Sequence, residues 1–150
     1  MDILEANIYD SEDILNWRND PLTRSMSISS EEITIEEHHR WFLNCLTNPL
    51  DSLFIGMLLE KKIGVCRFNF DSQSKFSEVS INLNPLMRGN NLSFPLLYYS
   101  VLKYQELNNY PLKSTIKKIN TPSLKIFQKC GFKIVNEIND RYFLNLNARL

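Results

Sequence analysis

The segment Leu83–Leu97 contains residues whose types and spacing suit an anion-binding site. An alternating strand pattern runs into Pro85, and a helical pattern begins a few residues later, so a short loop joins strand to helix. The centre of this loop, Arg88-Gly89-Asn90-Asn91, holds residue types that tolerate a left-handed backbone. Successive N–H groups can then point into one concavity at a helix N-terminus, which binds anions. The alternative is an ordinary turn with a solvated Arg88.

The helix after the loop is predicted from apolar residues that recur at spacings of three and four. Pro95 cannot make the hydrogen bond back to the fourth preceding residue, so the helix must begin near Leu92 or Ser93. The N–H groups of the loop therefore stay free for a ligand. The predicted packing stripe consists of Phe94, Leu97, Val101, Tyr104 and Leu107.

Length and composition predict one domain spanning residues 1–150, since a chain of 150 residues with 43% hydrophobic content fills one core. Lys plus Arg equal Asp plus Glu at 17 each, so no basic field attracts nucleic acid or an anionic membrane. Three scattered cysteines without metal-ligand spacing are typical of reduced thiols. With no signal peptide and no apolar stretch of membrane-spanning length, we expect a cytoplasmic protein. The oligomeric state stays open.

The patterns along the chain predict an α+β fold. In the first half they indicate a strand, two helices and three consecutive strands. A helix through Trp17 ends at Pro21, Leu22–Glu32 has no period, and a capping box of Thr34 and Glu37 opens the second helix. The predicted strands are Ile3–Asn7, Leu53–Leu59, Ile63–Phe70 and Phe76–Asn84.

The second half alternates between helix and strand before a closing hairpin. After the helix that begins near Leu92, the patterns indicate a strand at Leu112–Ile119, a helix capped by Asn120 and stopped by Gly131, and a hairpin of Lys133–Ile138 with Arg141–Leu146. A left-handed Gly131 would let Phe132 close over Phe127.

Two motifs in this order of elements resemble the GNAT superfamily of N-acetyltransferases. The loop Arg88–Ser93 is similar to that family's acyl-CoA pyrophosphate loop, with Arg88 in its usual place. Asn91 and Ser93 stand where the family expects Gly and a second small residue. The segment Asn120–Phe132 resembles the family's second signature. The resemblance covers nearly the whole chain.

The resemblance implies a fold and a cosubstrate. It implies a mixed sheet of about seven strands with about four helices, splayed between the fourth and fifth strands. Acetyl-CoA would enter the gap, with no metal required. Leu83 would offer a free backbone N–H group, commonly through a bulge. The implied acetyl-CoA-binding residues are Leu83, Arg88, Gly89, Asn90, Asn91, Leu92, Ser93, Asn120 and Phe127.

For catalysis the resemblance implies a general base and leaves the general acid undecided. Glu78 on the fourth strand is the candidate base, acting directly or through water, although strand glutamates are usually solvated. Phe127 stands where the family often carries a Tyr that protonates the leaving thiolate. Another tyrosine (Tyr98, Tyr99, Tyr104, Tyr110 or Tyr142), a water or no acid at all would serve that step. A rival hypothesis is a degenerate, non-catalytic module that binds CoA or a partner without chemistry.

The first fifty residues bear on the acceptor amine. They resemble the N-terminal half of amino-sugar-nucleotide N-acetyltransferases of the pseudaminic acid pathway, which implies a UDP-linked amino sugar as substrate. Aromatic faces suit stacking on a base or sugar, and arginines suit a diphosphate. Ribosomal-protein N-terminal acetyltransferases share the Trp-Arg-Asn opening, so a peptide α-amine is the second candidate. The implied acceptor-binding residues are Trp17, Arg18, Arg24, His38 and Trp41, for which packing roles are the alternative.

Overall fold

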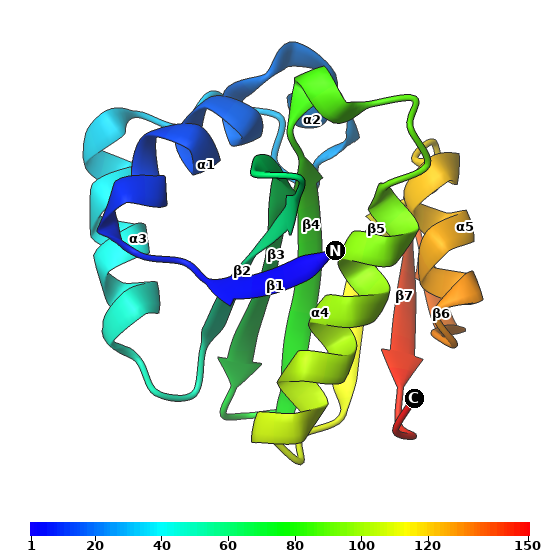
Figure 1. The fold of residues 1–150 in the computed structure, drawn as a ribbon. Coiled ribbons are helices and arrows are strands. Elements are labelled where there is room, and N and C mark those ends of the chain that lie inside the picture. Colours follow the sequence, from blue (N-terminus) through cyan, green and yellow to red (C-terminus); the bar gives the residue numbers. More distant parts are fainter.

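A computed structural model describes residues 1–150 as one seven-stranded mixed sheet with helices on both faces (Figure 1). The strand order is β1-β2-β3-β4-β5-β7-β6, and every neighbouring pair is antiparallel except β4 and β5. The elements are β1 (Asp2–Glu5), α1 (Ser11–Asn19), α2 (Pro21–Met26), α3 (Ile35–Thr47), β2 (Ser52–Leu58), β3 (Lys61–Asp71), β4 (Phe76–Leu83), α4 (Ser93–Leu107), β5 (Leu112–Lys117), α5 (Thr121–Lys129), β6 (Lys133–Ile138) and β7 (Arg141–Leu146), with 3-10 turns at Ile8–Asp10 and Pro85–Met87.

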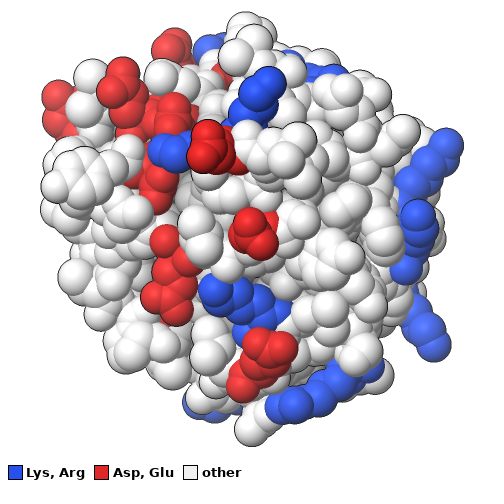
Figure 2. Space-filling model, in the orientation of Figure 1, with Lys and Arg blue, Asp and Glu red and all other residues white.

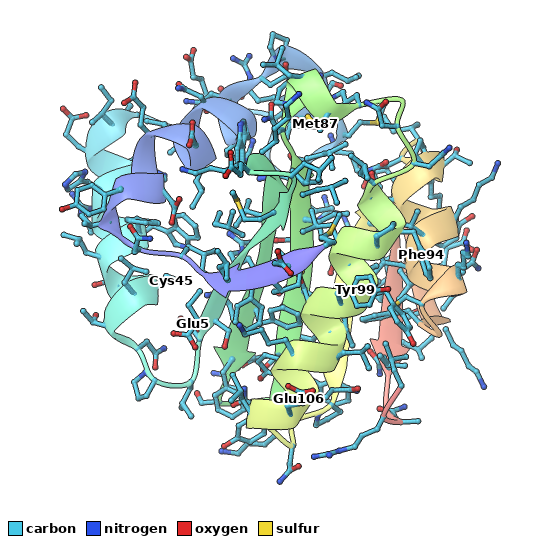
Figure 3. The ribbon with its side chains drawn as sticks, in the orientation of Figure 1. Glu5, Cys45, Met87, Phe94, Tyr99 and Glu106 are labelled. Carbon is cyan, nitrogen blue, oxygen red and sulfur yellow. The ribbon has the colours of Figure 1, made fainter.

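Side-chain alternation along the strands divides the interior into two cores. On β3, Val65 faces the core beneath α1 and α3, whereas Cys66 and Phe68 face the core beneath α4 and α5. The larger core is centred on Tyr104 of α4, whose ring stacks on Phe68 with centroids 4.3 Å apart. Figure 3 shows Cys45 directed from α3 toward the sheet and Phe94 at the start of α4. Alternate side chains of β3 therefore contribute to the cores on opposite faces of the sheet.

The sheet parts between β4 and β5, as predicted. These two strands pair only at Ser77 with Leu112 and at Glu78 with Lys113. The Ser114 hydroxyl then donates a hydrogen bond of 2.9 Å to the Val79 carbonyl, and beyond that point the strands diverge. The paired end keeps the two halves of the sheet together, while the open end leaves β4 without a neighbour on one side.

The end of α5 also follows the sequence prediction. Gly131 has a left-handed φ of 95°. The Phe132 N–H donates to the Phe127 carbonyl at 3.0 Å, and the two phenyl rings pack with centroids 5.0 Å apart. This is the hydrogen bond and the apolar contact expected of a helix that ends in a left-handed glycine.

The strand predictions are confirmed to within a few residues, but the helix prediction needs two corrections. There are five α-helices rather than about four, because Leu22–Glu32 is not uniformly irregular. Pro21 opens α2 instead of only ending α1, and the Asp20 carboxylate accepts a hydrogen bond from the Thr23 N–H at 3.0 Å as its cap. A six-residue helix is too short to show a period. In α4, Leu107 is 60% exposed and does not belong to the packing stripe.

None of the helices combines the length and the apolar character needed to cross a bilayer.

Candidate active site

The parting of β4 and β5 opens a cavity of about 960 Å³ that connects the two faces of the sheet. Its walls come from α1, α2 and α3 on one side, from β3, β4 and β5 in the middle, and from α5 on the other side. This volume lies within the range of small-molecule sites. The loop at Arg88 and the candidate base Glu78 both border this cavity, which is therefore the candidate site.

The loop between β4 and α4 has the conformation expected of an anion site. Gly89 and Asn91 both have left-handed φ angles, 78° and 57°. The backbone N–H groups of Gly89, Asn90, Asn91 and Leu92 donate to no acceptor within the protein, and α4 begins directly after them. Four free amides at a helix N-terminus form a concavity that suits phosphate oxygens. The loop therefore fits the diphosphate of an acyl-CoA.

Only some side chains of this loop face the cavity. Arg88, Gly89 and Ser93 line the cavity, whereas Asn90, Asn91 and Leu92 do not. The Asn90 side chain holds the loop from outside by donating to the carbonyls of Met87 at 3.2 Å and Arg88 at 3.1 Å. The predicted contribution of Asn90, Asn91 and Leu92 to acetyl-CoA binding therefore rests on their backbone amides.

Arg88 already has side-chain partners within the protein. Its guanidinium forms an ion pair with Asp20 and donates to the Thr23 hydroxyl at 2.9 Å. The hydrogen bond from Arg88 lowers the pKa of the Asp20 carboxyl below its ordinary value. Because Asp20 also caps α2, this contact joins the loop before α4 to the helices that form the opposite wall. Arg88 thus positions the loop in this structure.

Backbone N–H groups on β4 also face the cavity, but for a different reason than expected. The register of β3 with β4 runs from Phe76 to Leu83 without a shift, so the expected bulge near Leu83 is absent. The Asn84 N–H donates to the Ile63 carbonyl of β3. Alternation in an antiparallel ladder then directs the amides of Leu83 and Ile81 away from β3, toward the gap. The divergence of β5 leaves them available to a ligand.

Glu78 lines the cavity on the face of β4 that looks toward α1 and α3. Arg67 of β3 lies diagonally across the same face, since Arg67 pairs with Ser80 and Asn69 pairs with Glu78. The structure therefore brings the predicted base beside a guanidinium that the sequence analysis did not select. A single charge inside the apolar run Ile63–Phe70 was the signal that could have identified Arg67.

Three of the five predicted acceptor-binding residues line the cavity: Arg18, His38 and Trp41. His38 is 3% exposed, and its Nε2 atom lies 3.0 Å from the Ser11 hydroxyl. Burial lowers the pKa of His38, so its ring is neutral at pH 7. The ring packs between Trp41 and Phe42. These residues form an aromatic wall with one polar edge.

The other two predicted acceptor-binding residues lie elsewhere. Trp17 is 5% exposed and belongs to the core beneath α1 and α3, because its position on α1 faces the sheet. Arg24 donates to the Ser30 carbonyl at 3.2 Å and lies 3.5 Å from the Glu32 carboxylate, outside the cavity lining. In this structure Trp17 packs the core and Arg24 holds the segment after α2.

On the far side, Asn120, the N-cap of α5, and Phe127 of α5 line the cavity, and their contact with acetyl-CoA stays a prediction. Asn120 caps α5 by accepting from the Ser123 N–H at 3.3 Å. None of the six tyrosines of the chain lines the cavity. Of the three alternatives for protonating a leaving thiolate, another tyrosine therefore has no support from the structure. Residues on β5 and β7 that line the cavity, such as Thr115 and Phe143, were also missed by the sequence analysis.

Comparison with known proteins agrees with this geometry. The sequence profile of the family described as acetyltransferase (GNAT) domain matches residues 3–133. The chain is 28% identical over 144 residues to acetyltransferase PseH of Campylobacter jejuni subsp. jejuni serotype O:23/36 (strain 81-176), a match that covers 95% of this chain and 88% of that protein.

Solved structures of acetyltransferases share the fold. An N-acetyltransferase from Staphylococcus aureus Mu50 superposes with a TM-score of 0.80 at 23% identity, covering 97% of this chain and 96% of that one. Spermidine N-acetyltransferase from Vibrio cholerae, solved in complex with CoA and spermine, superposes with a TM-score of 0.81 at 15% identity, covering 99% and 96%.

The fold and the cavity define an acyl-CoA-dependent acyltransferase. The match over residues 3–133 is more specific: the chain belongs to the GNAT family of acetyltransferases, and acetyl-CoA is its acyl donor.

The Asp20–Arg88 contact gives a testable dependence of stability on pH. Asp20→Asn keeps an N-cap for α2 but removes the charge, and should lower the free energy of unfolding at pH 7 by about 1 kcal/mol. The folded-state pKa of Asp20 is lowered, so its contribution is complete above its ordinary pKa. The contribution is lost as the pH falls through the lowered value. The difference between wild type and variant should therefore shrink below about pH 4.

Urea denaturation between pH 3 and pH 7 measures this difference. Asp2→Asn is the matched control, because Asp2 is exposed at the start of β1 and forms no ion pair. A difference for Asp20→Asn that stays constant over the whole range would contradict the charge-based account of this contact.

Proposed function

We propose that this protein transfers an acetyl group from acetyl-CoA to the primary amine of a nucleotide-linked amino sugar. The observation that carries this choice of acceptor is the charge of the cavity. Its lining contains four arginines and a single carboxylate, that of Glu78. Arg88 and Arg141 pair with Asp20 and Asp140, but two of the four arginines have no carboxylate partner. A diphosphate suits such a lining better than a cation does.

Different residues of the cavity bind the acyl donor and the acceptor amine. The free amides of Gly89–Leu92 receive the diphosphate of acetyl-CoA, whose thioester supplies the acyl group. The amides of Ile81 and Leu83 donate hydrogen bonds toward the gap, where they can bond pantetheine or polarise a carbonyl oxygen. His38 and Trp41 offer an aromatic wall to a sugar or a base. The amine thus lies on the α1–α3 side of β4, next to Glu78.

Acetyl transfer forms a C–N bond, breaks a C–S bond, and moves one proton from the amine and one to the thiolate. We assign the first proton to the Glu78 carboxylate, directly or through a water, because it is the only carboxylate in the cavity. Phe127 has no proton to give and no tyrosine lines the cavity, which leaves water or no acid at all for this step. Of these two, we propose water as the proton source for the thiolate.

A peptide α-amine is the second candidate, since the Trp-Arg-Asn sequence at residues 17–19 is also found in ribosomal-protein N-terminal acetyltransferases. A basic peptide would need acidic side chains along its path. Figure 2 shows acidic side chains over the region of α1 and α3. Of these helices' first-turn acids, Glu37 is already bonded within the capping box of α3, and none lines the cavity. The charge of the cavity therefore favours the sugar nucleotide.

An assay of CoA thiol release across a panel of amines tests the acceptor. We expect turnover on UDP-linked 4-amino sugars and little or none on short peptides or on spermidine. Turnover on peptides with none on the sugar nucleotides would defeat the proposed acceptor. Calorimetric binding of CoA without turnover on any amine would favour the non-catalytic hypothesis.

Replacing the proposed base separates catalysis from binding. Glu78→Gln should lower kcat by about 100-fold or more and leave the Kd for CoA within about twofold, because a general base acts on the amine. The shape of the pH–rate profile should also change. Ser80→Ala, on the same face of β4, is the matched control. An unchanged rate and pH profile in Glu78→Gln would show that the base lies elsewhere.

A further inference from the structure

Arg67 is the most unusual charged residue in the molecule. It lies in the middle of β3, between the buried residues Cys66 and Phe68, and its side chain lines the cavity. Its Nε atom is enclosed and has no hydrogen-bond partner, and no ion pair involves its guanidinium. The guanidinium carbon lies 5.5 Å from the centroid of the Trp41 ring. A charge left in this state in a folded protein calls for an explanation.

Arg18 of α1 is in a similar state. One terminal nitrogen donates to the Ser29 carbonyl at 2.7 Å, while the other, Nη1, is buried without a partner. Burial, and next the charge of Arg67, lower the pKa of the Arg18 guanidinium. The two arginines thus repel each other across one cavity, and neither forms an ion pair with a carboxylate. An anion placed there would relieve both the repulsion and the missing hydrogen bonds.

The charge of Glu78 acts on Arg67 only from a distance. Glu78 shares a face of the sheet with Arg67, but the two side chains form no ion pair within 4.0 Å. The other arginines that line the cavity or lie near it do have acidic partners: Arg24 with Glu32, Arg88 with Asp20, and Arg141 with Asp140. The lack of a partner is therefore specific to Arg18 and Arg67.

We propose that Arg18 and Arg67 form a seat for a phosphate group of the acceptor, so that an amine bearing a phosphate is preferred over the same amine without one. Contact with Ser29 fixes Arg18, and stacking on Trp41 fixes Arg67. The seat lies on the α1–α3 side of the sheet, whereas the free amides of Gly89–Leu92 precede α4. The acceptor and acetyl-CoA thus have separate phosphate sites. This inference rests on the proposed function and identifies the part of the acceptor that is recognised.

The test compares a UDP-linked 4-amino sugar with the methyl glycoside of the same sugar, which lacks the diphosphate and the uridine. Arg67→Lys retains the charge but loses the planar array of donors, and should lower kcat/KM for the UDP-linked sugar by about 10- to 100-fold, mainly through KM. It should leave kcat/KM for the methyl glycoside within about twofold. The 1-phosphate of the sugar, which carries a phosphate without uridine, should respond to the variant as the UDP-linked sugar does. Arg40→Lys, an exposed arginine on α3, is the matched control.

A binding measurement gives a second readout that does not depend on turnover. Inorganic pyrophosphate should shift the Nε–Hε signal of Arg67 in a ¹H–¹⁵N spectrum of the full chain, and should inhibit competitively with the UDP-linked sugar. The shift should persist when CoA is bound. The proposed phosphate site would be contradicted if Arg67→Lys lowered kcat/KM equally for both acceptors. It would also be contradicted if pyrophosphate left the Arg67 signal unchanged. Pyrophosphate displaced by CoA would assign the arginines to the donor instead.

The failure of this inference differs from the failure of the proposed function. If the wild type acetylated both acceptors equally well, the proposed phosphate site would be contradicted, whereas acetyl transfer to an amino sugar would still hold. If neither sugar is acetylated, the proposed acceptor fails, while the pyrophosphate titration still decides whether Arg67 binds phosphate.

Discussion

The structure depends on the incomplete pairing of β4 with β5. Two residue pairs join these strands, Ser77 with Leu112 and Glu78 with Lys113, and the divergence that follows creates the cavity. The same divergence leaves the amides of Ile81 and Leu83 without a neighbouring strand. Buried backbone donors are costly when unpaired, so a gap of this kind is stable only when it is short, solvated or filled. The larger core, which includes Val79 of β4 and Leu112 of β5, packs next to the paired end.

Close packing of β3 against β4 keeps the open end rigid. Gly64 faces Leu83 across the ladder, and a Cβ atom at Gly64 would lie 2.5 Å from the Asn82 carbonyl oxygen and 2.9 Å from the Leu83 Cα. Only glycine permits this approach. The Asp20–Arg88 ion pair connects the loop that follows β4 to the helical wall. The donor side and the acceptor side of the cavity are thus held in a fixed relation by a backbone contact and a charge contact.

Local patterns predicted most of the fold because the elements have strong local signals. The capping box of Thr34 and Glu37, the proline of α4 and the left-handed Gly131 each act within a few residues. The six-residue helix α2 was missed because its stability comes from an Asp20 cap that also holds Arg88, which is 68 residues away in sequence. The predicted bulge was wrong because the divergence of β5, a tertiary feature, already frees the amides near Leu83.

The sequence predicts the parts of the candidate site that consist of backbone groups in one loop. It predicts less well the parts that consist of side chains far apart in the sequence. The loop at Gly89–Leu92 could be recognised from residue types that favour left-handed conformations. Trp17 and Arg24 were selected by their chemical type, yet packing and a local ion pair account for both. Arg67 became apparent only when the register of β3 placed it on the same face as Glu78, opposite Arg18 of α1.

We propose that the free amides before α4 receive the diphosphate of acetyl-CoA. Hydrogen–deuterium exchange of the segment that contains Gly89–Leu92 tests it most directly, because amides without internal acceptors exchange quickly. Saturating CoA should slow exchange in this segment by about 10-fold or more, with little change in the exposed strand β6. If calorimetry shows that CoA binds while exchange at Gly89–Leu92 stays as fast as in the free protein, the account is wrong.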